Sequence, residues 1–342
     1  MERIINWGII GLGNAALNLA KEFDKIGNSK LLAVASLTQK KREFFKRQFN
    51  LLNQNIYSTY DEIFNNKDID IIFISLPNSM HEEFCIKAIQ NNKNVLVEKP
   101  ITTNLESLKN IKRLFLKKNL ILEEGTANKF HPFYKEVLNK LKNIDYTKII
   151  NVKSSFGNDA LGGKKIFGIR LKKINHNKRL FNKNLGGGSI LDGGIYPASL
   201  FIDLLCLHQT KFSKNFKILN CKKKLTNNVD LSSTLELKIN NFYIKLETSL
   251  IEPLKNNFEV EMTNETIIIE NIFNISSESK IISKKNDNTE IINNNFKNTS
   301  YFYEIKKISK MLIENSSDKS KKLDLFSKIE KNMTLLDIWL KN

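Results

Sequence analysis

Short apolar runs alternate with amphipathic stretches along the first third of the chain. Strand-like runs occur at residues 4–11, 31–37, 69–76, 94–98 and 120–123, and helical patterns occur at residues 15–25, 39–49, 81–90 and 104–118. Strands that alternate with helices in this way are typical of a parallel sheet built from crossover units. The pattern therefore predicts a doubly wound α/β domain over residues 1–124, with a Rossmann-type sheet.

The pattern changes after residue 124. A helix at residues 132–141 precedes strands with alternating polar and apolar positions at residues 148–156, 233–239, 242–250, 257–262 and 266–270. Strands joined by short turns indicate an antiparallel sheet. Residues 280–292 are predicted to form a surface hairpin or loop, and amphipathic helices at 301–314 and 323–340 close the sequence. We therefore predict a second, α+β domain over residues 125–342 with a largely antiparallel, open sheet.

Composition adds constraints on partners and compartment. The chain has 342 residues and three cysteines, Cys85, Cys206 and Cys221, whose spacing fits neither a disulfide framework nor a zinc site. Lys and Arg total 54 against 36 Asp and Glu, but the basic residues are spread along the whole length. Because neither a basic arm nor a helix-turn-helix or zinc module is evident, we expect no nucleic-acid partner.

Membrane and export signals are also missing from the pattern. The longest apolar runs, such as residues 71–76, are far shorter than the roughly 20 residues that a membrane span needs. The N-terminus passes straight into a strand and lacks the pattern of a signal peptide. We expect a cytoplasmic protein with no membrane partner and, because the histidines lack companions at metal spacing, no bound metal.

The first strand leads into a glycine motif with the spacing G-x-G-x-x-A. Gly11 permits the tight turn, Gly13 lets the backbone approach a pyrophosphate, and Ala16 allows the helix to pack on the strand. Asn14 and Ala15 open the helix whose N-terminus would face the phosphates. The motif predicts dinucleotide binding by these residues.

The end of the second strand reports on the choice of nicotinamide cofactor. An acidic residue there would hold the ribose 2′-hydroxyl of NAD. The sequence has instead Ser36, Leu37 and Thr38, followed by Lys40, Lys41 and Arg42. Hydroxyl groups and cations suit a 2′-phosphate, so we predict NADP in preference to NAD, with Lys41 among the contacts. The alternative is that the basic residues are only the solvated start of a helix.

Three further motifs follow in order behind the glycine motif. They are Pro77-Asn78-Ser79-Met80-His81, Glu98-Lys99-Pro100, and the glycine-rich segment from Leu185 to Pro197 that contains Asp192 and Tyr196. In this order and spacing the chain resembles the glucose-fructose oxidoreductase / inositol dehydrogenase family, also called Gfo/Idh/MocA. It looks closest to the dihydrodiol and xylose dehydrogenase branch, because Tyr196 stands where inositol-type members carry histidine.

The resemblance implies a set of site residues. Lys99 and Tyr196 would be the acid–base pair, with Asp192 one helical turn before Tyr196 orienting the substrate or the phenol. A tyrosine phenol can protonate an alkoxide as hydride arrives and act as the base in reverse. The cofactor would be contacted at the strand ends by Leu76, Pro77, Asn78, His81, Glu98 and Lys99. For His81, a structural and a catalytic role remain equally open.

The expected function is hydride transfer between a nicotinamide and a secondary alcohol or carbonyl of a sugar or sugar-like substrate. A nucleotide-sugar ketoreductase or oxidase of surface-glycan synthesis is one alternative, favoured by the basic residues between positions 164 and 179. A non-catalytic NADP-binding regulator is another, although a regulator has no chemical need for Lys99, Asp192 and Tyr196 together.

The resemblance also implies a homodimer or homotetramer that pairs through the open face of the second-domain sheet. We expect that face to carry apolar side chains such as Leu235, Leu237, Ile244 and Leu246, which are too apolar to leave in water.

Overall fold

The chain folds into two compact units in a computed structural model that describes residues 3–162, 165–166, 169–170, 174–210, 216–314 and 318–342. The first unit comprises residues 1–130 and 298–326, and the second comprises residues 131–297 and 327–342. The expected boundary at residues 124/125 thus lies a few residues before the observed one. The sequence pattern did not predict that residues 298–326 return to the first unit.

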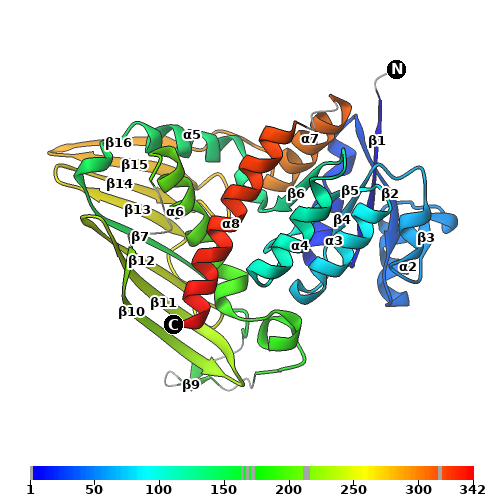
Figure 1. The fold of residues 1–342 in the computed structure, drawn as a ribbon, viewed down its shortest axis with the longest axis horizontal. Helices are drawn as coiled ribbons and strands as arrows, with labels where there is room; N and C mark the ends of the chain where they lie inside the picture. The colour runs from blue at the N-terminus through cyan, green and yellow to red at the C-terminus, as the bar shows by residue number, and fades with distance from the viewer. Residues whose placement is uncertain (1–2, 163–164, 167–168, 171–173, 211–215, 315–317) are drawn as a thin grey trace. The chain divides into compact units, whose positions relative to one another are not determined.

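The first unit is built on a parallel sheet of six strands in the order β3-β2-β1-β4-β5-β6 (Figure 1). The strands are β1 (Ile5–Ile10), β2 (Ser29–Ala35), β3 (Ile56–Tyr57), β4 (Ile71–Ile74), β5 (Asn94–Glu98) and β6 (Leu122–Gly125). Strand order reverses between β1 and β4, which is the position where open α/β sheets bind ligands. The predicted doubly wound sheet is confirmed.

Helices connect the parallel strands as the periodicity predicted. They are α1 (Asn14–Ala20), α2 (Gln39–Gln48), α3 (His81–Gln90) and α4 (Leu105–Phe115). Helix α7 (Ser300–Ile313) also belongs to this unit, although it connects no parallel strands. Short 3₁₀ turns are η1 (Phe23–Lys25), η2 (Asn53–Asn55), η3 (Glu62–Asn65), η4 (Asn78–Met80) and η5 (Ala127–Phe130). The expected first helix is shorter than predicted, because α1 ends at Ala20 and its last turn is replaced by η1.

Helix α7 completes the core of the first unit. Ile305 and Ile308 are fully buried and belong to the same apolar cluster as Trp7. The Trp7 indole donates a 3.1 Å hydrogen bond to Ser309 Oγ, and the Ser29 hydroxyl lies 2.8 Å from the same atom. A buried indole N–H needs such a partner. The interior of the N-terminal unit is therefore completed by residues from near the C-terminus.

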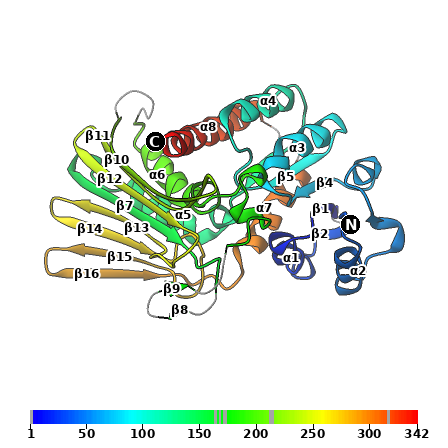
Figure 2. The same ribbon diagram turned by 90° about the horizontal axis from the view of Figure 1, so that it is seen from below.

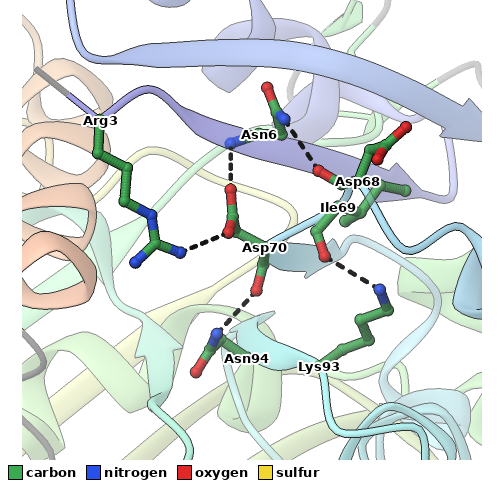
Figure 3. Close-up of polar contacts among 7 residues, drawn as sticks. All are labelled: Arg3, Asn6, Asp68, Ile69, Asp70, Lys93 and Asn94. Carbon is green, nitrogen blue, oxygen red and sulfur yellow. Dashed lines mark hydrogen bonds and ion pairs between the residues drawn. The ribbon is translucent and has the colours of Figure 1, made fainter. Parts of the chain in front are cut away.

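A polar network fixes the amino ends of the central strands (Figure 3). The Asp70 carboxylate accepts hydrogen bonds from Arg3 Nη2 at 2.7 Å and from the backbone N–H of Asn6 at 2.8 Å. The backbone carbonyl of Asp70 accepts a hydrogen bond from Asn94 Nδ2 at 2.7 Å, and Lys93 Nζ donates to the backbone carbonyl of Ile69 at 3.0 Å. These bonds set the register at the edge of the sheet opposite to the strand ends that carry the motifs.

The second unit contains a sheet of eight strands in the order β10-β11-β12-β7-β13-β14-β15-β16 (Figure 2). The strands are β7 (Ile149–Gly157), β10 (Phe216–Thr226), β11 (Val229–Ile239), β12 (Phe242–Ser249), β13 (Asn257–Met262), β14 (Glu265–Glu270), β15 (Lys280–Lys285) and β16 (Asn288–Asn293), with a separate pair β8 (Lys165–Ile166) and β9 (Ile169–Arg170). Neighbours in the large sheet pair antiparallel, except that β7 runs parallel to β12. The largely antiparallel sheet is confirmed, and residues 280–292 form its edge hairpin.

Helices lie against one face of this sheet. They are α5 (Pro132–Lys142), α6 (Ile195–Leu207) and the second part of α8 (Lys319–Lys341), with short turns η6 (Tyr146–Lys148), η7 (Arg179–Phe181), η8 (Lys183–Leu185) and the π-helical turn η9 (Ile190–Gly194). Among the described residues, the stretch Lys183–Leu207 is apolar enough to cross a membrane by length and composition. However, 78% of its most apolar window is buried, which is typical of the core helix of a soluble protein.

The expected apolar open face is wrong. Leu235, Leu237 and Leu246 are fully buried and Ile244 is 1% exposed within the single chain. These side chains point toward the helices, because strand residues alternate between faces. The opposite face carries charged ladders instead, such as Lys153 placed 3.6 Å from both Glu259 and Glu261. An argument for oligomerisation from exposed leucines therefore fails.

Candidate active site

The parallel register brings four of the predicted cofactor segments to one edge of the first sheet. From one strand to the next, the paired positions are Ala35, Ile10, Ile74 and Val97. The predicted segments begin one or two residues beyond this row, at Ser36, Gly11, Leu76 and Glu98. Carboxyl ends of parallel strands form the ligand-binding edge of α/β sheets. The fold therefore gathers the cofactor motifs of the first unit.

The two motif glycines are required for different reasons. Gly11 has a φ of +83°, and a Cβ there would lie 2.6 Å from the carbonyl oxygen of Ser75. At Gly13, which precedes α1, a Cβ would meet none of the described atoms within 4 Å. Packing of the chain thus explains Gly11 but not Gly13. Open space at the N-terminus of a helix is what a pyrophosphate needs, so the residues present fit a dinucleotide.

A guanidinium group from α2 contacts the residue that follows β2. Arg42 Nη1 donates a 2.5 Å hydrogen bond to the carbonyl of Ser36, and the Thr38 N–H donates to Ser36 Oγ at 3.2 Å. Lys41 is exposed, and Leu37 is 65% exposed. The sequence prediction named Lys41 among the contacts, whereas Arg42 is the basic residue that bonds the strand end. The available signal was position, because Arg42 lies one helical turn after Thr38.

His81 connects two of the loops at this edge. It begins α3, is fully buried, and its Nε2 lies 2.9 Å from the carbonyl oxygen of Leu76. Its Nδ1 lies 2.8 Å from the carbonyl oxygen of Pro100. Asn78, also predicted, is 4% exposed in the turn between Pro77 and α3. Contacts of both ring nitrogens to backbone carbonyls indicate that His81 positions the loops.

Lys99 stands directly after β5. The Lys99–Pro100 peptide is cis, and the Lys99 N–H donates to Glu98 Oε2 at 3.2 Å. Glu124 Oε1, at the end of neighbouring β6, accepts a 2.9 Å hydrogen bond from the N–H of Ile101. Glu98 and Lys99 are both partly exposed. The lysine thus extends from a turn whose backbone is held by two carboxylates.

A group of carboxyl groups lies behind this turn. Glu304 of α7 is fully buried, and neither of its side-chain oxygens has a hydrogen-bond partner in the described structure. Burial, together with the charges of Glu98 and Glu123, raises the pKa of Glu304 well above its usual value. Burial also raises the pKa of Glu123 to about 7, although Lys307 opposes this shift. Burial and the neighbouring carboxylates therefore favour the uncharged form of Glu304, and the sequence prediction did not include this residue among the site residues.

In the second unit, the glycine-rich segment packs tightly against its neighbours. A Cβ at Gly187 would lie 2.7 Å from the carbonyl oxygen of Leu180. Gly188 has a φ of +117°, and a Cβ there would collide with the carboxylate of Asp230. That carboxylate accepts hydrogen bonds from Ser189 Oγ at 2.6 Å and from the Ile190 N–H at 2.7 Å. Asp230 therefore anchors the start of η9.

Asp192 and Tyr196 follow on this anchored segment. Arg179 Nη2 donates a 2.8 Å hydrogen bond to Asp192 Oδ1, forming an ion pair. The ring of Tyr196 packs against Phe156 with centroids 4.9 Å apart and against Phe273 at 5.9 Å. Asp192 and Tyr196 lie one turn apart, while Lys99 belongs to the first unit. The second unit thus contains a carboxylate paired with an arginine side chain, and one helical turn later a phenol whose ring packs against two phenylalanines.

Comparison with known proteins adds to this geometry. Residues 5–126 match the model of a family described as an oxidoreductase family with an NAD-binding Rossmann fold, GFO_IDH_MocA. This match contains the glycine turn, the His81 loop and the Glu98-Lys99-Pro100 turn. Over these residues the chain is similar to the Gfo/Idh/MocA family.

Two curated relatives each match a little over half of the chain. The trans-1,2-dihydrobenzene-1,2-diol dehydrogenase of Xenopus tropicalis is 27% identical over 194 residues, covering 56% of the chain and 53% of the relative. The dTDP-3,4-didehydro-2,6-dideoxy-alpha-D-glucose 3-reductase of Saccharopolyspora spinosa is 27% identical over 199 residues, covering 58% and 55%. The match thus spans about half the length of these relatives.

A solved structure extends the likeness of fold to nearly the whole chain. The 3-ketoreductase KijD10 from Actinomadura kijaniata, in complex with NADP and TDP-benzene, superposes with a TM-score of 0.81. The superposition covers 98% of this chain and 96% of KijD10 at 17% identity. The arrangement of a Rossmann sheet followed by a mostly antiparallel sheet is therefore shared with an NADP-binding enzyme.

Some predicted residues lie outside what the structure describes. Lys164, Lys172 and Lys173 of the basic stretch fall among the undescribed residues, and Lys165 and Arg170 belong to β8 and β9. Lys178 is exposed, and Arg179 is the member of the stretch that pairs with Asp192. Sequence analysis assigned Arg179 no role beyond its charge, since nothing in the pattern indicated its partner.

Proposed function

We propose that the chain is an NADP-preferring oxidoreductase that moves a hydride between the nicotinamide and a secondary alcohol or carbonyl carbon of a sugar or sugar-like substrate. The observation that carries this proposal is the open space at Gly13: a Cβ there would contact no described atom of the chain, so packing does not explain the glycine. The match of residues 5–126 to the family model and the likeness of fold to NADP-binding KijD10 support it. When bound, the nicotinamide would supply the hydride acceptor or donor.

The chain's own residues would handle the proton and the orientation of the substrate. In the oxidation direction, the Tyr196 phenolate takes the hydroxyl proton while the carbinol carbon loses its hydride, and a carbonyl forms. Lys99, at the carboxyl end of β5, donates to the substrate oxygen and favours the ionised phenol. Asp192 accepts a hydrogen bond from a substrate hydroxyl. This division of roles requires Lys99, Asp192 and Tyr196 to act on one substrate.

The first experiment is a fluorescence titration of the purified protein with NADPH and NADH, followed by a substrate panel of aldoses, dihydrodiols and keto-sugar nucleotides. Lys99→Met and Tyr196→Phe serve as variants that retain the glycine turn. Tight NADPH binding, with turnover lost in both variants, is expected. Failure to bind either nucleotide overturns the proposal.

A nucleotide-sugar substrate is the second candidate. The names of two similar proteins favour it, since one acts on a dTDP-sugar and the other is a 3-ketoreductase crystallised with TDP-benzene. Turnover of keto-sugar nucleotides with no turnover of free aldoses would select this candidate. A chain that binds NADPH tightly but turns over no member of the panel favours instead an NADP-binding regulator.

We also propose a cytoplasmic homodimer or homotetramer. The charged ladders on the open face of the eight-stranded sheet, including the Lys153–Glu259 and Lys153–Glu261 pairs, support pairing that depends on salt. Light scattering at low and high ionic strength tests this, and a monomer at micromolar concentration in low salt contradicts it.

A further inference from the structure

The ion pair between Arg179 and Asp192 has fixed geometry on both sides. Arg179 starts η7, whose Phe181 is 2% exposed and packs with Leu231 and Leu250. The N–H of Gly188 donates to the carbonyl of Leu180 at 3.0 Å, so η7 is bonded to the segment that leads to Asp192. Backbone contacts therefore hold Arg179 next to Asp192, in addition to the attraction between the two charges.

The same contacts explain why Gly187 is needed. A Cβ at this position would lie 2.8 Å from the carbonyl oxygen of Asn182, the atom that accepts a 2.9 Å hydrogen bond from the Gly187 N–H. Only a residue without a side chain allows the two backbones to approach this closely. The close approach places Arg179 beside the turn that carries both Asp192 and Tyr196.

Among the described residues, the side chains that approach the two glycines of the Asp192–Tyr196 turn are uncharged. Phe156 of β7, Thr248 of β12 and Trp339 of α8 approach its two glycines, and none of these side chains carries a charge. Asp230 of β11 is bonded to Ser189 and Ile190 at the start of the turn. The structure defines one ion pair for the described part of this turn, in which Arg179 is the cation and Asp192 the anion.

An unpaired Asp192 one turn from Tyr196 would oppose formation of the phenolate, because two negative charges would then lie close together. Arginine is permanently charged, and its planar group holds a carboxylate in a defined orientation. We propose that Arg179 is a positioning residue of the reaction, which holds Asp192 in one orientation and neutralises its charge beside the Tyr196 phenol. This inference rests on the function proposed above.

The test combines activity with a measurement that needs no turnover. The variants are Arg179→Gln, Arg179→Lys, Asp192→Asn and the double variant Arg179→Gln/Asp192→Asn, with Lys178→Gln as the matched control. Lys178 is the neighbouring exposed cation, so its loss removes the same charge from the chain without affecting the Asp192 pair. Ionisation of Tyr196 is followed as the difference in phenolate absorbance between each variant and the same variant carrying Tyr196→Phe.

In Arg179→Gln we expect the Tyr196 ionisation to move to higher pH by roughly one unit, as loss of a nearby cation does. We expect kcat/KM to fall about tenfold to a hundredfold, which corresponds to about 1.4 to 2.8 kcal/mol. Binding of NADPH and the Lys178→Gln titration should stay unchanged. Arg179→Lys should keep the titration near that of the parent protein, and the double variant should return it toward the parent curve.

The outcomes separate the two proposals. Loss of activity in Arg179→Gln with an unmoved Tyr196 titration means that the arginine is merely structural, and it overturns this inference. An equal shift in Lys178→Gln does so as well. A parent protein that turns over no substrate overturns the proposed function, whereas the phenol titration still reports whether Arg179 neutralises Asp192 beside Tyr196.

Discussion

The imidazole of His81 lies with its Nδ1 2.8 Å from the carbonyl oxygen of Pro100, although the two residues belong to different loops of the sheet edge. The other ring nitrogen contacts the carbonyl of Leu76 at 2.9 Å. A single buried ring thus sets the spacing between the loop after β4 and the turn that carries Lys99. This spacing decides how a nicotinamide ring would fit between them.

Replacing His81 by Ala should weaken both the fold and cofactor binding. The variant leaves two buried carbonyl groups without the ring, which costs about 2–4 kcal/mol of the free energy of unfolding. Urea unfolding measures this cost, and fluorescence titration should show weaker NADPH binding. His208→Gln is the control, because His208 Nε2 contacts the carbonyl of Leu141 in the second unit. An equal loss of NADPH affinity in both variants would contradict the loop-spacing role.

Gly13→Ala should separate binding from folding. Its Cβ would meet no described atom of the chain within 4 Å, so thermal stability should stay within about 0.5 kcal/mol of the parent protein. The added methyl group would stand where a pyrophosphate approaches the helix, so NADPH affinity should fall at least about tenfold. Gly27→Ala is the matched control, since Gly27 also has open space around its Cα. Unchanged NADPH affinity in Gly13→Ala would argue against a cofactor at this turn.

Arg42→Gln should reduce the preference for NADPH over NADH. A hydrogen bond to a charged group contributes about 1.5–3 kcal/mol, which is roughly tenfold to a hundredfold in the affinity ratio. The measurement compares dissociation constants for the two nucleotides in this variant and in Lys41→Gln. A greater loss of NADPH preference in Lys41→Gln than in Arg42→Gln would favour Lys41 as the contact to the 2′-phosphate.

The buried carboxyl groups predict a pH dependence of stability. Because the pKa of Glu304 is raised in the folded state, its folding contribution is fully present below its usual pKa and is lost as pH rises toward the folded value. Glu123, with a pKa raised to about 7, acts in the same direction between roughly pH 4.5 and 7. Glu304→Gln should therefore gain stability relative to the parent protein as pH increases.

Thermal unfolding midpoints measured from pH 5 to pH 9 check this expectation. Glu43→Gln is the control, because Glu43 is an exposed carboxylate of α2 in the same unit. A difference between Glu304→Gln and the parent protein that stays constant over the pH range would mean that Glu304 is not held uncharged.

The sequence predicted those parts of the fold in which local pattern and packing agree. The bounds of α3 and β5 were predicted to the residue, because turns lie at the start of the helix and between the helix and the strand. The return of α7 to the first unit was missed, since the polar groups that bond Ser309 lie at Trp7 and Ser29, far away in sequence. Strand β10 was missed because its lysine-rich edge sequence, in which no residue is buried, resembles a loop.

The candidate site divides in the same way. Residues within motifs, such as Gly11, His81 and Lys99, were named from the sequence, and the parallel register places them at one edge. Asp230 was not named, and Arg179 and Glu304 were named without a role in the site, because the importance of all three depends on partners that lie elsewhere in the chain. Alternation alone also did not tell which face of the second sheet the helices cover, and this led to the wrong face for Leu235 and Leu246.

The bond between Trp7 and Ser309 has a consequence for how the protein is made. A nascent chain emerges from the ribosome N-terminus first, and domains generally fold as they appear. The first unit, however, lacks α7 until residues 131–297 of the second unit have been synthesised. During translation the indole of Trp7 therefore lacks its hydrogen-bond partner Ser309 until α7 has been made. A truncated product that ends before residue 298 should depend on chaperones and should be degraded.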